Sequence, residues 1–252
     1  MITVHRRDDL AVDDQETASV RWHLGQHPLV DPEGSQIGPI LAIKDVTIEP
    51  EGVFHASVPH DTEELLYTVS GEVTPVHHLH DGTAFPPGTV VATIDGRHRS
   101  HYKLRNPVAG RTARVVEVLW RPYRAGLAPS TSTAYPGSTG SAALVPVIVP
   151  LTEASPPPTA VAAHQEVRGW AGALTSARDV PLTSDESLYA LVLGGSLTVD
   201  GQLAADGDGV LVEGERLATI TPVGECELLI IAVPLVFPGE FSWGDARYRL
   251  AE

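Results

Sequence analysis

Residues 52–71 read GVFHASVPHDTEELLYTVSG, and this stretch decides the fold. Glycines close it at both ends, where they fit the turns that bound a pair of strands. Positions 58, 60 and 64 share parity, so on a continuous strand the side chains of Val58, His60 and Glu64 would point the same way, into a barrel. A metal site on a sheet requires that geometry.

Short β-like runs separated by Gly, Pro and Asp turns occupy most of the remaining chain, and this pattern predicts an all-β sandwich or barrel. In the first half they are PILAIKDVTI (39–48), GTVVATI (88–94), RSHYKL (99–104) and ARVVEVLW (113–120). In the second half they are VPVIVPL (145–151), GWAGALT (169–175), SLYALVLGGSLTVDG (187–201), GVLVEG (209–214), LATITPV (217–223) and ECELLIIAVPLVF (225–237). Residues 1–40 show no clear period.

The two halves repeat the same order of strand, glycine turn and strand, which predicts two similar barrels in one chain. Residues 124–145, rich in Ser, Thr, Gly, Pro and Ala, are interpreted as a linker or an extended crossover. We therefore expect an N-terminal barrel with the candidate site over residues 1–135 and a structural C-terminal barrel over residues 136–252.

Composition narrows the class of protein. Of 252 residues, 42% are apolar and 19% charged, enough apolar material for a buried core. Acidic residues outnumber basic ones by 32 to 17, and a net charge of −15 excludes sequence-independent binding to nucleic acid or anionic membranes. The single cysteine excludes an intramolecular disulfide, and no apolar stretch is long enough to span a bilayer. With a polar N-terminus, the chain is predicted to be cytoplasmic.

Ten of the eleven histidines lie in the first half, so histidine chemistry is expected there. The spacing in residues 52–71 resembles the first cupin motif, in which a glycine precedes His-x-His, a glutamate and a second glycine. The whole chain is similar to the pirin-like bicupins. Motifs that carry this resemblance are the sequences VPHDTEELLYTVSGE (58–72), PG (87–88), DGRHRSHYK (95–103), DPE (31–33), IGPI (37–40), LWRP (119–122), GLAPS (126–130) and, in the second half, GWAG (169–172), VDG (199–201) and DG (208–209).

The resemblance implies two tandem cupin barrels and one non-haem metal, commonly iron, held by three histidines and one glutamate. Taken one at a time, these ligand positions fall on Val58, His60, His101 and Lys103. Two of them carry residues that do not bind metals, and an ammonium at position 103 would repel a cation. Lys103 could instead fill the cation's place and pair with a glutamate, whereas Glu64 could complete a two-histidine, one-carboxylate set.

A second interpretation concerns the register of residues 97–105. Arginine, histidine and lysine alternate there with period two, which is typical of a solvated strand face. The intervening residues, Tyr102 and Leu104 among them, would then point inward, and His98 rather than His101 would meet His60. His60 and Glu64 could also be a buried pair that only stabilises the barrel.

Three functions remain open. The first is a metal-dependent oxygenase, similar to quercetin 2,3-dioxygenase, in which His60, Glu64 and His101 hold the ion and the ion binds a phenolic substrate. The second is a metal-free isomerase, cyclase or lyase in the same pocket, with His60 or Glu64 as base and Lys103 as acid. The third is a non-catalytic protein that binds a small ligand or a protein partner, as nuclear pirins do as transcriptional cofactors.

Overall fold

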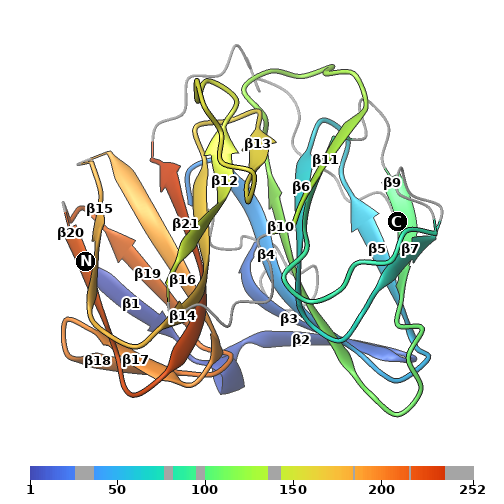
Figure 1. The fold of residues 1–252 in the computed structure, drawn as a ribbon, viewed down its shortest axis with the longest axis horizontal. Coiled ribbons are helices and arrows are strands. Elements are labelled where there is room, and N and C mark those ends of the chain that lie inside the picture. Colours follow the sequence, from blue (N-terminus) through green and yellow to red (C-terminus); the bar gives the residue numbers. More distant parts are fainter. Residues whose placement is uncertain are drawn as a thin grey trace.

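The computed structural model describes residues 1–25, 37–76, 82–94, 100–135, 143–183, 185–215 and 217–235. Regular structure in this part of the chain is β-strand throughout, apart from a 3-10 turn at Arg7–Asp9. No helix in it has the length and hydropathy needed to cross a bilayer. The strands form two large and two small sheets, which build two barrels side by side (Figure 1). The predicted all-β fold with two tandem barrels is confirmed.

The first barrel combines a seven-stranded sheet with a three-stranded one. In spatial order the large sheet holds β11 (Ser130–Ala134), β8 (Val90–Ile94), β6 (Glu63–Ser70), β10 (Ala113–Trp120), β4 (Ile40–Ile48), β3 (Ala18–Gly25) and β2 (Ala11–Gln15). The small sheet holds β5 (Val53–Val58), β9 (Ser100–Arg105) and β7 (Thr74–Val76).

The second barrel repeats this plan. Its large sheet holds β1 (Ile2–His5), β19 (Gly209–Glu213), β16 (Glu186–Gly194), β21 (Cys226–Pro234), β14 (Arg168–Leu174), β12 (Val145–Pro150) and β13 (Val161–Ala163). Its small sheet holds β15 (Arg178–Pro181), β20 (Leu217–Pro222), β17 (Ser196–Val199) and β18 (Gln202–Ala205).

Hydrophobic side chains are divided among three clusters. One fills each barrel, and the third contains residues of both large sheets, such as Tyr67 and Trp120 of the first and Tyr189 and Leu229 of the second. Because alternate residues of a strand point to opposite faces, each large sheet buries one face in its own barrel and the other against its partner. The two barrels therefore share one apolar interface.

The glycine at the end of the 52–71 stretch is required by its backbone. Gly71 has a φ of +72°, and a Cβ there would lie 2.8 Å from the Cα of Ala113 and from the carbonyl oxygen of Thr112. A side chain would be strained both by the left-handed conformation and by contact with β10. The glycine thus permits β6 to turn tightly beside its neighbour.

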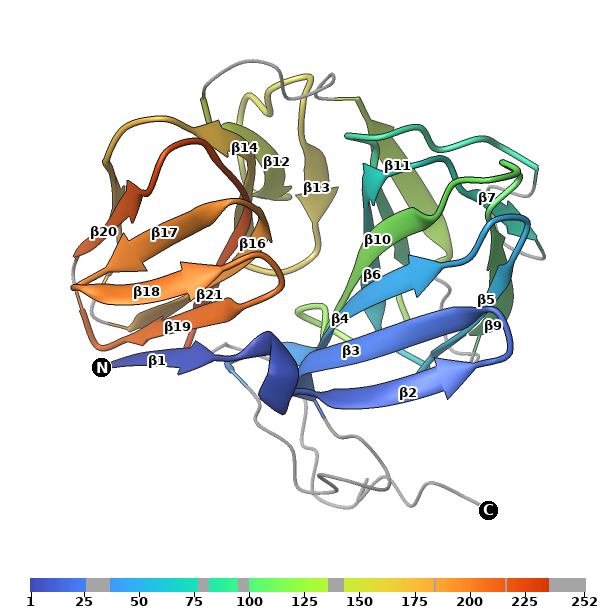
Figure 2. The same ribbon diagram turned by 90° about the horizontal axis from the view of Figure 1, so that it is seen from below.

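The N-terminal residues contain three strands that the sequence analysis missed. β1 pairs with β19 of the second barrel, whereas β2 and β3 belong to the first, so the chain crosses between barrels within its first residues (Figure 2). The apolar period is weak because β2 is an edge strand whose middle residues, including Asp13 and Asp14, are exposed. β11 was also missed: it lies inside the predicted linker and pairs with β8.

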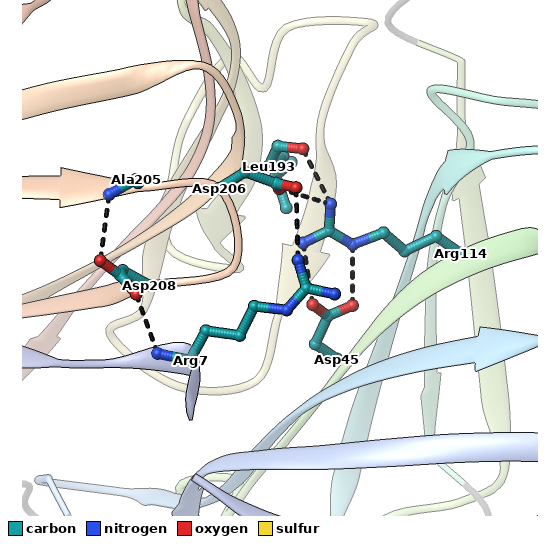
Figure 3. A network of polar contacts seen from close by, with 7 residues as sticks. All are labelled: Arg7, Asp45, Arg114, Leu193, Ala205, Asp206 and Asp208. Carbon is teal, nitrogen blue, oxygen red and sulfur yellow. Dashed lines mark hydrogen bonds and ion pairs between the residues drawn. The ribbon is translucent and has the colours of Figure 1, made fainter. Parts of the chain in front are cut away.

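Charged residues also link the two barrels (Figure 3). Arg114 of β10 donates two parallel hydrogen bonds to the carboxylate of Asp45, at 2.8 and 2.9 Å. Its other terminal nitrogen donates to the carbonyl oxygen of Leu193 at 2.8 Å and to Asp206 at 2.9 Å, both in the second half of the chain. Arg114 is thus a tie from the first barrel to the second.

A buried histidine lies at the same junction. Nδ1 of His23 on β3 is 3.1 Å from the hydroxyl of Tyr189 on β16, and that hydroxyl is 3.2 Å from Nδ1 of His5. Nε2 of His23 is buried and has no hydrogen-bond partner among the described residues. Burial lowers the pKa of His23 from 6.5 to about 4, because water no longer solvates the charged ring.

This shift predicts a pH dependence. A lowered pKa means that the contribution of His23 to stability is complete above pH 6.5 and is lost as pH falls through about 4. The wild type should therefore lose roughly 3 kcal/mol more stability than His23→Asn between pH 7 and pH 4. Urea unfolding at the two pH values measures this difference. Equal losses in both proteins would show that His23 does not titrate in this range.

Candidate functional site

Four polar side chains meet inside the first barrel: Lys44, Glu64, Tyr102 and Glu117. They come from β4, β6, β9 and β10, and none of them is more than 5% exposed. Around them lie the apolar residues of the barrel core, such as Val58 and Leu66. Buried ionisable groups in apolar surroundings are stable only when they neutralise one another, so the four must be considered together.

Strand register explains how these residues meet. Lys44 lies directly opposite Glu117 in the β4–β10 ladder, and Nζ of Lys44 is 2.5 Å from Oε2 of Glu117. Glu64 of β6 pairs with Thr93 of β8, the next strand in the same sheet. Cross-strand partners share a face, so the lysine and both glutamates point toward the small sheet. From that sheet Tyr102 reaches across the barrel and donates a hydrogen bond to Oε1 of Glu64.

The two glutamates are coupled. Glu64 pairs with Leu119 of β10, two residues from Glu117, so the two carboxyl groups share the inner face of the sheet. Burial raises the pKa of Glu117 from 4.5 to about 7; the Lys44 ammonium opposes this rise and the negative charge of Glu64 adds to it. Burial and Glu64 also raise the pKa of Tyr102, so its phenol stays protonated and donates. The cluster therefore combines a phenol donor, Tyr102, with two carboxyl groups, of which Glu117 takes up a proton more readily than a glutamate in water.

One member of the cluster, Glu64, lies toward one end of the barrel, whereas the other three lie in mid-strand. Glu64 is the second residue of β6 and Thr93 is the last but one of β8. The loop after β5 is at this end, and its His60 has a side chain 48% exposed, with Nδ1 3.1 Å from Oδ2 of Asp61. Asp61 also accepts a hydrogen bond from the backbone of Gly126 at 2.6 Å. His60 is therefore a surface residue at this end of the barrel and not a buried partner of Glu64.

The structure does not bring together the predicted set of His60, Glu64 and His101. β5 ends at Val58, so the shared parity of positions 58 and 60 does not extend to His60, which lies in the following loop. His101 and Lys103 are exposed, and between them Tyr102 is buried. The outward register is therefore the one observed, and Lys103 is on the outer face of β9 rather than in the pocket. Val58 does face the interior, and His98 lies outside the described residues.

Two residues of the cluster, Lys44 and Glu117, were absent from the sequence prediction. Each is a charged residue inside a largely apolar strand, Lys44 beside Asp45 in AIKDV (42–46) and Glu117 in VVEVL (115–119). A charge at such a position has to be neutralised inside the fold, and this was the available signal. The lysine that pairs with a buried glutamate is Lys44, and not Lys103 as the sequence analysis considered.

A second polar group, formed by Glu63, Trp120 and His164, joins the barrels near this end. The Glu63 carboxylate accepts hydrogen bonds of 2.8 Å from Nε1 of Trp120 and from the backbone of His164, and Nδ1 of His164 is 3.2 Å from its other oxygen. Neighbouring residues 63 and 64 thus point to opposite faces of β6, one to the interface and one into the barrel. Trp120 packs in the apolar interface and donates a hydrogen bond to Glu63, so the carboxylate of Glu63 has a structural role.

The residues present do not fit the metal that this fold implies. Among the described residues, no group of three His, Cys, Asp or Glu side chains could hold an ion. The two carboxylates that do meet are accompanied by the Lys44 ammonium, a cation bonded to Glu117 at 2.5 Å. An ammonium in contact with a carboxylate competes directly with a divalent ion for that ligand.

Comparison with known proteins agrees with this architecture. Residues 154–233 match the family model of the quercetinase C-terminal cupin domain. The structure of the bacterial pirin YhhW from Escherichia coli, in complex with nickel(II), superimposes with a TM-score of 0.81 at 18% identity, over 94% of this chain and all of that one. The chain therefore has a bicupin fold like that of this bacterial pirin. No curated protein matches this bicupin in sequence.

A further structure, quercetin 2,3-dioxygenase from Acinetobacter baumannii, matches the bicupin with a TM-score of 0.67 at 14% identity, over 92% of this chain and 79% of that one. At these identities the likeness establishes the fold and not the reaction.

Proposed function

We propose that this bicupin is a metal-independent protein whose first barrel binds a small organic molecule and moves a proton on it. The observation that carries the proposal is the buried cluster, which brings a carboxylate, a phenol donor and an ammonium together without a metal-ligand set among the described residues. Carboxylates serve as general bases, and phenols stabilise the oxyanion that forms when a carbon acid loses its proton. Isomerases, cyclases and lyases use this chemistry.

Each residue has a role in this scheme. Glu64 removes the proton, because it is the carboxylate that Tyr102 contacts and it lies nearest the strand ends. The Tyr102 hydroxyl turns from Glu64 to the oxygen on which charge develops. Glu117 and Lys44 lie behind Glu64 and hold the net charge of the cluster near zero. A phenol, an enol or a ketone with an acidic C–H group is the substrate class that this arrangement suits.

The second barrel has a structural role in this proposal, over residues 136–252 as predicted, while residues 1–135 carry the site. Its interior cluster is apolar, from Leu174 and Val180 to Cys226 and Ala232. β1 is the exception to this division, because it belongs by sequence to the first unit and by pairing to the second.

The main alternative is a metal-dependent dioxygenase of the quercetinase type, which the matches to the family model and to quercetin 2,3-dioxygenase favour. A non-catalytic binding protein is favoured instead by the low exposure of all four cluster residues. Two measurements on the same probes, quercetin and a series of small phenols and ketones, separate the three functions. The first is proton-deuterium exchange in D2O, followed by NMR, and the second is oxygen uptake. The proposal predicts exchange that persists with a chelator present. Oxygen uptake that the chelator abolishes supports the dioxygenase, and no reaction with any probe supports the binding protein.

A further inference from the structure

The charges inside the first barrel have to balance. Glu64 and Glu117 are 2% and 0% exposed, and both lie on the inner face of the large sheet, where Glu64 pairs with Leu119, two residues from Glu117. Two buried carboxylates cannot both remain ionised without a compensating cation, because desolvation of each charge costs several kcal/mol or more. One proton between them and the single positive charge of Lys44 bring the cluster to neutrality. Lys44 thus supplies the charge that a metal ion supplies in a metal-binding barrel.

Lys44 is held in this place from two sides. Across β10 its ammonium bonds to Glu117 at 2.5 Å, and across β3 it lies 4.8 Å from the centroid of the Trp22 ring. Both partners are its direct register neighbours, Glu117 in the β4–β10 pair and Trp22 in the β3–β4 pair. A carboxylate on one side and an aromatic face on the other are the two surroundings that stabilise a buried ammonium. The lysine is therefore an integral part of the barrel wall.

We propose that Lys44 is a built-in cation that replaces a divalent metal ion, and that removing its charge turns the cluster into a cation site of Glu64, Glu117 and Tyr102. The inference rests on the proposed function in one respect, which is that the wild-type barrel works without a metal. Carboxylate and phenol oxygens are hard donors, so the site would take Mn²⁺ or Mg²⁺ in preference to a softer ion.

The test compares Mn²⁺ binding by the wild type and by Lys44→Met, using isothermal titration calorimetry and thermal unfolding. We expect Lys44→Met to bind one Mn²⁺ per chain at least about 100-fold more tightly than the wild type, because the repulsion of a unit charge about 4 Å away is removed. Mn²⁺ should also raise the melting temperature of the variant and leave that of the wild type unchanged. Lys44→Arg, which keeps the charge, is the matched control and should behave like the wild type.

Adding Glu64→Gln to Lys44→Met should abolish the gained affinity. If Lys44→Met does not fold without metal, it is refolded with Mn²⁺, and recovery of the folded protein supports the inference. The double variant Lys44→Met/Glu117→Gln, which removes both charges, shows whether the barrel tolerates methionine at position 44. If the double variant folds and Lys44→Met does not recover with Mn²⁺, the inference is overturned. A folded Lys44→Met that ignores Mn²⁺ also overturns it. A metal in the wild-type chain would contradict both the inference and the proposed function. A folded, metal-free Lys44→Met overturns the inference alone, so the two failures are distinguishable.

Discussion

Replacing Arg114 with methionine is expected to lower the free energy of unfolding by about 3–5 kcal/mol. The side chain of Asp45 is only 6% exposed and receives two hydrogen bonds from this guanidinium, so the variant leaves a buried carboxylate without its cation. The carbonyl oxygen of Leu193 loses this donor as well, and the carboxylate of Asp206 keeps only its ion pair with Arg7 at 3.6 Å among the ion pairs of the described residues. Because these groups belong to different barrels, the loss weakens the junction and not a single sheet.

Arg168→Met is the matched control for this measurement. Arg168 also pairs with a glutamate, Glu186, at 2.5 Å, but it is 34% exposed and both residues belong to the second barrel. Removing this more solvated pair should cost no more than about 1 kcal/mol. Chemical denaturation of the wild type and the two variants gives the comparison. Equal losses would show that Arg114 contributes no more to the junction of the barrels than an exposed ion pair does.

Glu64→Gln is expected to reduce proton-deuterium exchange on the substrate by a factor of about 10²–10⁴, the range that general-base catalysis contributes. Glutamine keeps the shape of the side chain and can still accept a hydrogen bond from Tyr102, but it cannot accept a proton from carbon. Tyr102→Phe should also lower the rate, since the phenol hydrogen bond to the oxyanion is lost.

His101→Ala is the control that separates the two registers of β9. In the register that the family resemblance implied, His101 lies in the site and its loss abolishes activity. In the structure His101 is exposed on the outer face, so the exchange rate should be unchanged. A large loss in His101→Ala together with a normal rate in Glu64→Gln would reverse the assignment.

The architecture could be predicted from the sequence because most of its signals are local. Turns rich in Gly and Pro separate apolar runs, and these runs agree with the strands from β4 to β10 nearly residue for residue. Strands without an apolar period were missed. All four residues of β1 are half-buried, so the strand has no alternation of apolar and polar residues. Its partner β19 is more than two hundred positions away in the sequence, so the pairing cannot be predicted from a local pattern.

The site was harder to predict because it depends on register and on distant contacts. In residues 97–105 both parities offer side chains with chemistry, and only packing decides that Tyr102 faces inward while His101 and Lys103 face solvent. The ion pair of Lys44 and Glu117 joins residues 73 positions apart. Each charge could have been noticed in its apolar strand, but only the sheet order of β4 and β10 shows that the two meet.

The most direct test of this account is the metal content of freshly purified wild-type protein, prepared without chelator and measured by elemental analysis. Lys44 already occupies the Glu117 carboxylate in the first barrel, so we predict a transition-metal content far below one ion per chain. Iron, nickel or another transition metal near one ion per chain would contradict the account. It would place a ligand set in this barrel that the described residues do not form.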